Sequence, residues 1–185
     1  MTADDEDVLE EDTAPVLAGK GVPSGIALLN GEIEILTEKR LPHLDRGSVL
    51  AFAARSKGSG NEAFFALICE NSLVPRSSMT EKYASIMSTG LIKLVSSGVV
   101  FWPPARAERF VLVYQNTMGK PFSKHLEESE GGLGWKQEKA IKSFIRPMVG
   151  ILLDLHDTDM PHGSINMGNI FEGVSEEGAG SLILG

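Results

Sequence analysis

The residues with the clearest chemical potential lie in PHGSINMGNIF, residues 161–171. His162, Ser164 and Asn169 offer an imidazole, a hydroxyl and an amide there, and a strand-like run follows. This is the outline of a catalytic loop, yet the stretch contains no carboxylate. The Ser164 hydroxyl is a poor general base at neutral pH, because it carries no negative charge and does not readily take a proton.

A possible metal cluster lies just before this loop, in HDTDMPH. His156, Asp157, Asp159 and His162 are residue types that bind metal ions. A polar helix end followed by a loop, with His162 bonded to the backbone, accounts for the same residues. We prefer that interpretation and expect no metal site.

Cys69 is the single cysteine and follows the apolar residues Leu67 and Ile68 in a strand-like run. One cysteine excludes an internal disulfide and fits a reducing compartment. We expect a small buried hydrophobe rather than a reactive thiol. No signal peptide is visible and no apolar run reaches the ~18 residues of a membrane helix, so we expect a cytoplasmic chain with no membrane segment.

Acidic residues are concentrated at the N-terminus. The net charge is -8, and seven acidic residues between positions 4 and 12 have no basic residue among them. We expect residues 1–23 to form a disordered acidic tail and linker, because they hold too few apolar groups to offset the entropy of ordering. The rest is almost neutral and has no basic patch, which argues against a nucleic-acid partner. With 42% apolar residues, 185 residues can bury a core.

Strand-like runs alternate with turn residues from residue 25 to 116. GIALLNGEIEIL contains Asn30-Gly31, the pair best suited to a type I′ hairpin turn. SVLAFAARS and EAFFALICE flank a second turn at residues 57–61, and GVVFWPP and RFVLVYQN add two more strands. Pro103-Pro104 should end the first of these two strands, because proline has no N–H to donate to the hydrogen bonds of a sheet.

Two segments show helical spacing. The first follows a possible cap at Ser77 or Ser78, and Gly90 is a point where it could divide; its apolar residues are Tyr83, Ile86, Met87, Leu91 and Leu94. The second spans residues 138–156, where Pro147 predicts a bend or a restart of the helix near Arg146. The sequence thus predicts an α+β protein.

This order of elements, with LHDTDMPHGSINMGNIF and SLILG, resembles the eukaryotic-type protein kinase fold over residues 30–185. The resemblance implies a five-stranded antiparallel sheet with one helix at residues 24–116, then a hinge and the helices of a truncated carboxy-terminal lobe at 117–185. RFVLVYQN resembles the strand that enters the hinge, and MGKPFSKHLEE the helix after it. The kinase D-F-G motif would begin just after Gly185.

The catalytic landmarks of kinases are altered. Against H-R-D-L-x-x-x-N, His162 and Asn169 match, Gly163 stands for the Arg and Ser164 for the catalytic Asp. The lysine of V-A-I-K falls on Cys69, and Gly47 alone remains of the glycine-rich loop. Glu81 is the candidate for the helix carboxylate that would pair with that lysine. Because the lysine is missing, we expect Glu81 to be solvated. The resemblance therefore implies a pseudokinase, a regulatory or scaffolding module that acts through protein contacts.

Two alternatives stay open. A divergent kinase could bind ATP and Mg with Asn169, taking its cation from Lys39 or Lys57 and its base from Asp157 or Asp159. A non-kinase α+β interaction domain would make the likeness of the loop accidental. In the kinase fold, helices after the D-F-G position cover the long helix, which would leave Phe144, Met148, Leu152 and Leu155 exposed here. We therefore expect that the chain belongs to a longer protein, or that helix 138–156 packs on a second copy or a separate partner.

Overall fold

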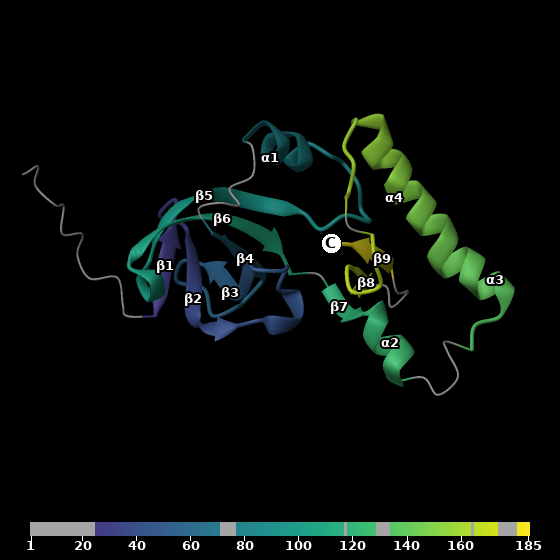
Figure 1. Ribbon diagram of the computed structural model, residues 1–185, viewed down its shortest axis with the longest axis horizontal. Helices are drawn as coiled ribbons and strands as arrows, with labels where there is room; N and C mark the ends of the chain where they lie inside the picture. The colour runs from purple at the N-terminus through teal and green to yellow at the C-terminus, as the bar shows by residue number, and fades with distance from the viewer. Residues whose placement is uncertain (1–24, 71–76, 117, 129–133, 164, 174–180) are drawn as a thin grey trace, which may run out of the picture.

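A six-stranded antiparallel sheet dominates the computed structural model (Figure 1). The structure describes residues 25–70, 77–116, 118–128, 134–163, 165–173 and 181–185. The strands of the sheet lie in the order β1-β2-β3-β4-β6-β5. Their bounds are β1 (Ile26–Leu29), β2 (Ile33–Arg40), β3 (Leu50–Ser56), β4 (Phe64–Cys69), β5 (Leu94–Trp102) and β6 (Ala107–Gln115). The predicted acidic tail lies outside the described residues.

Both predicted hairpins are confirmed. Asn30 and Gly31 have φ angles of 51° and 76° between β1 and β2, the conformation that a type I′ turn requires. Glu32 N donates to Leu29 O at 3.1 Å and closes this turn. β3 and β4 pair antiparallel across residues 57–61, where Gly58 has a φ of 75°. Turn chemistry that depends on neighbouring residues was thus readable from the sequence.

The five strands that the kinase resemblance implies are wrong in number, because the sheet has six. All six strand-like runs of the sequence form strands, and β1 folds back onto β2 through the Asn30-Gly31 turn. It lies at one end of the strand order, yet it approaches β5 at the other end: Asn30 Nδ2 donates to Ser96 Oγ at 3.1 Å. A Cβ on Gly98 of β5 would lie 3.0 Å from Leu29 Cδ1. The sheet is therefore curled until its two ends meet.

The predicted strands at residues 98–104 and 109–116 correspond to β5 and β6, which pair antiparallel. β5 ends at Trp102, and Pro103 opens a short 3-10 helix, η3 (Pro103–Ala105). This confirms that the two prolines end the strand. Buried side chains of β1 to β6 pack together on one face of the curled sheet, with Phe52 and Trp102 in edge-to-face contact at 4.8 Å.

The first predicted helix is shorter than its apolar spacing suggests. α1 (Ser77–Ala84) ends before Leu91, and Leu94 begins β5. Gly90 O accepts a hydrogen bond from Leu184 N at 2.8 Å, and Ile92 N donates to Leu184 O at 3.2 Å. The helical prediction for residues 85–94 is wrong. Ser85 and Ile86 still bond back to α1, but Gly90 and Ile92 pair with the distant Leu184 instead of continuing the helix.

A second, three-stranded sheet follows the first in the order β7-β8-β9. It contains β7 (Met118–Pro121), β8 (Ile170–Gly173) and β9 (Ser181–Leu184), and α2 (Phe122–Glu128) follows β7 directly. The predicted strand after Asn169 is therefore present. Buried residues of β8 and β9 contact the long helix on one side and the first sheet on the other.

The long predicted helix is present with an irregular middle. It consists of α3 (Gln137–Ala140), a turn of π-helix η4 (Ile141–Ile145) and α4 (Arg146–Asp157). Pro147 is at the start of α4, where its missing N–H cannot bond to the preceding turn. A π-turn is one way for a helix to accommodate such a break. None of the helices within the described ranges is long and apolar enough to cross a membrane.

The exposed side of this helix differs from the expected one. Met148 and Leu155 are buried, and Phe144 and Leu152 pack against the same cluster as β8 and β9. The exposed apolar residues are instead Ile141, Ile145, Val149 and Leu153. The prediction that Phe144, Met148, Leu152 and Leu155 would be exposed was therefore wrong. The helix is apolar on two sides, and spacing alone does not show which side the strands cover.

Candidate functional site

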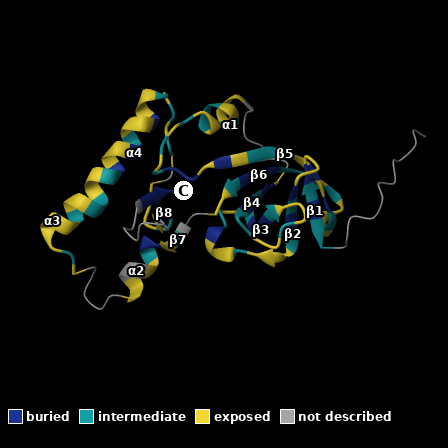
Figure 2. Cartoon of the chain, turned by 180° about the vertical axis from the view of Figure 1, so that it is seen from behind, coloured by how far each residue is buried: buried dark blue, intermediate teal, exposed yellow. Residues whose placement is uncertain are grey.

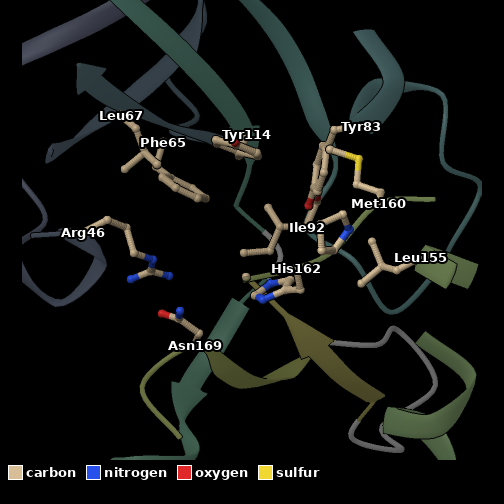
Figure 3. A pocket seen from close by; sticks show the side chains of 12 residues that line it. Arg46, Phe65, Leu67, Tyr83, Ile92, Tyr114, Leu155, Met160, His162 and Asn169 are labelled. Carbon is tan, nitrogen blue, oxygen red and sulfur yellow. The ribbon is translucent and has the colours of Figure 1, made fainter. Parts of the chain in front are cut away.

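The candidate site is a cavity of about 350 Å³ beside the second sheet (Figure 3). β4 contributes Phe65 and Leu67, which share a face because side chains alternate along a strand. Tyr114 of β6 and Tyr83 of α1 close another side. The remaining lining residues are Arg46, Ile92, Leu155, Met160, Pro161, His162, Asn169 and Gly185. Segments far apart in the sequence thus form one largely apolar space.

Contacts between aromatic rings hold together the wall of the cavity formed by β4, β6 and α1. Phe65 lies opposite Tyr114 in the β4–β6 register, and their rings stack with centroids 5.4 Å apart. Tyr83 meets Tyr114 edge-on at 6.2 Å and donates a hydrogen bond to Ile92 O at 2.7 Å. Burial raises the pKa of Tyr83 to about 12, and burial together with Tyr83 raises the pKa of Tyr114 further. Both phenols therefore stay neutral at physiological pH.

Arg46 is the cationic residue of the lining. A turn from Arg46 to Val49, with Gly47 at φ 58°, holds its backbone, and both residues exchange N–H···O bonds of 2.9 Å. The guanidinium Nη1 donates to Leu44 O and Asp45 O at 3.4 and 3.3 Å, and its carbon lies 5.9 Å from the Phe171 ring centre. Burial lowers the pKa of Arg46, and the neighbouring Asp45 opposes that shift. Arginine nevertheless keeps its charge in proteins.

His162 and Asn169 from the predicted loop both line the cavity. Asn169 is only 6% exposed, and its backbone N–H donates to Asn166 O at 2.9 Å. Gly185 N in turn donates to Asn169 O at 2.8 Å, which joins the end of β9 to this loop. The structure therefore brings together two of the loop residues singled out in the sequence. Ser164, the third, lies outside the described residues.

Cys69 is on β4 but does not line the cavity. It is a free thiol, 3% exposed, and burial raises its pKa, so the thiol form is favoured. Phe65 and Leu67 are the β4 residues that face the cavity. Sequence reasoning missed both, although the alternation of the strand from Cys69 back to Leu67 and Phe65 was a usable signal. Arg46 and Tyr83 gave no comparable signal, because their approach depends on the tertiary fold.

The lysines and aspartates considered as substitutes for the kinase catalytic groups lie outside the cavity. Lys39 forms an ion pair with Glu62, and Lys57 is exposed. Asp157, Asp159 and Glu81 are exposed, and none of these residues is among the described residues lining the cavity. Within the described ranges, no three His, Cys, Asp or Glu side chains gather in a way that could hold a metal ion.

The burial of His162 in the cavity predicts that the stability of the protein depends on pH. Burial lowers the pKa of His162 from its ordinary value of 6.5, the Gly185 backbone opposes this, and Arg46 adds to it. The unfolded chain therefore binds a proton at higher pH than the folded one. We expect the free energy of unfolding to be highest above pH 6.5 and to fall as the pH drops toward the folded pKa.

Urea unfolding between pH 8 and 5 measures this effect. His162→Gln should reduce the loss of stability over that window relative to the wild type. An unchanged slope in His162→Gln would contradict the assignment.

A scan against protein-family models finds no match for this chain, and a search of curated proteins finds no significant relative. The geometry and chemistry of the cavity are therefore what indicate the function of this chain.

Proposed function

We propose that this chain is a catalytically inactive, protein-kinase-like module that acts through protein contacts. Supporting this is the order of the elements: an antiparallel sheet with one helix, a short connection, then a long helix leading to the loop of His162 and Asn169. This is the order that the kinase resemblance implies. The sixth strand, β1, is an addition to that pattern.

The observation that carries the proposal is the chemistry of the cavity lining. Among the described residues of the lining, Arg46 is the one with a permanent positive charge, and none is a lysine, aspartate or glutamate. Phosphoryl transfer depends on positioned positive charge and metal ions, and on a group that orients the attacking hydroxyl. Phe65, Leu67 and Ile92 instead give this space an apolar surface.

Loss of these groups has a large kinetic effect. A positioned base contributes on the order of 10² to 10⁴ in rate. Removing one charge-stabilising donor costs roughly 10² to 10³ in kcat. Either loss alone lowers the rate by orders of magnitude, so we expect no physiologically useful transfer. We also propose a cytoplasmic location, because a free, buried Cys69 fits a reducing compartment.

Incubation of the 185-residue chain with labelled ATP and Mg²⁺ tests the proposal. We expect no labelled protein and ATP hydrolysis at the buffer rate. We also expect no thermal stabilisation, whereas a nucleotide at 100 times its Kd would add about 2.7 kcal/mol. Turnover that is lost in Arg46→Gln but kept in Arg146→Gln, an exposed arginine on α4, would refute inactivity and establish a divergent kinase.

A further inference from the structure

The long helix is exposed along much of α3 and α4, drawn in yellow in Figure 2, and its exposed residues include an apolar stripe. Ile141, Ile145, Val149 and Leu153 recur every four residues and are 40%, 50%, 49% and 54% exposed. Four large aliphatic residues in one row form a contiguous patch, unlike scattered surface hydrophobics, and such patches mark interaction sites. We call this surface the outer stripe.

Basic and acidic residues beside the outer stripe lie toward opposite ends of the helix. Lys142 and Arg146 lie toward its N-terminal end, and Asp154 and Asp157 toward its C-terminal end. All four are exposed, and within the described part of the chain none of them forms an ion pair. Two copies of this helix surface are therefore complementary in charge when the helices run antiparallel.

Gly150 lies between the basic and acidic ends. A Cβ built on it would meet no atom within 4 Å, so its backbone is open to solvent. Small residues at a helix crossing allow the two backbones to approach closely, as they do where helices pair in membranes. A crossing near Val149 and Gly150 would divide the helix into its basic and acidic halves.

We propose that the outer stripe binds the same stripe of a second copy of this chain, with the two helices antiparallel about a two-fold axis between Val149 and Gly150. Lys142 is then placed opposite Asp157 of the second copy, since seven residues lie between each of them and the axis. Arg146 is placed beside Leu153 and near Asp154. Because a two-fold interface repeats each contact, both ends of the pair are satisfied in the same way.

Parallel pairing of the same helices is disfavoured by the same charges. It would place Lys142 and Arg146 of both copies together at one end and the aspartates together at the other. Like charges at an interface cost several kcal/mol. Charge therefore selects the antiparallel arrangement, and the apolar stripe supplies its buried surface. This inference does not depend on the proposed inactivity of the cavity.

Sedimentation velocity over a range of concentrations of the 185-residue chain tests the dimer. We expect a concentration-dependent monomer–dimer equilibrium for the wild type. Val149→Glu places two carboxylates at the axis and should raise the dimer Kd by about 100-fold or more. Val99→Glu is the matched control: Val99 is 59% exposed on β5, and its variant should dimerise like the wild type. Circular dichroism checks that both variants are folded.

A charge exchange tests the predicted register. Lys142→Asp and Asp157→Lys should each weaken the dimer by about tenfold, because an exposed pair is lost twice in a symmetric interface. The double variant restores opposite charges and should recover most of the affinity. A monomeric wild type at all concentrations, or a dimer that Val149→Glu leaves intact, would overturn the proposal. A double variant no better than the single ones would overturn the antiparallel register.

Discussion

Replacing Phe171 with Ala is expected to lower the free energy of unfolding by about 3–5 kcal/mol. Phe171 is 0% exposed and packs in a cluster with Leu44, Phe65 and Ile183. It therefore joins the second sheet to the first beneath the cavity. The smaller side chain loses buried apolar surface and leaves a void that rigid strands cannot fill.

Urea denaturation followed by circular dichroism measures the effect of this change. Phe101→Ala is the matched control, because Phe101 is 61% exposed on β5. We expect that variant to stay within about 0.5 kcal/mol of the wild type. If the two variants lost similar stability, the placement of Phe171 between the sheets would be wrong.

The second large effect is expected from Gly119→Ala, which should lower the free energy of unfolding by roughly 1–3 kcal/mol. A Cβ on Gly119 would lie 2.6 Å from the Glu172 carbonyl oxygen. That atom belongs to the backbone of β8, so it cannot move aside as a flexible side chain would. The β7–β8 pairing must then separate or shift.

Gly60→Ala provides the comparison for this substitution. Gly60 lies in the turn between β3 and β4, and a Cβ there would meet nothing within 4 Å. We expect its thermal midpoint to match the wild type, while that of Gly119→Ala falls by several degrees. Equal midpoints would show that the β7–β8 contact is looser than the structure indicates.

The parts of the fold predicted correctly are those that depend on neighbouring residues. Asn30-Gly31 specifies a turn through its own φ angles, and Pro103 ends β5 because it lacks an N–H. These features need no knowledge of what lies across the molecule.

The parts that were missed depend on distant partners. Residues 85–94 have helical spacing, but Gly90 and Ile92 bond to Leu184, far along the chain. The long helix has two apolar sides, and only the position of β8 and β9 decides which is buried. In the cavity, the loop supplied His162 and Asn169, whereas Arg46 and Tyr83 arrive there through tertiary packing.

The curl of the large sheet has a consequence for how this protein meets others. An open sheet presents unpaired N–H and C=O groups on its outermost strands, which invite β-strand addition and aggregation. Here Asn30, in the turn that follows β1, donates a hydrogen bond to Ser96 of β5, and Gly98 of β5 lies against Leu29 of β1. Near this seam the sheet shields its own edges, so templated growth through backbone pairing is disfavoured there.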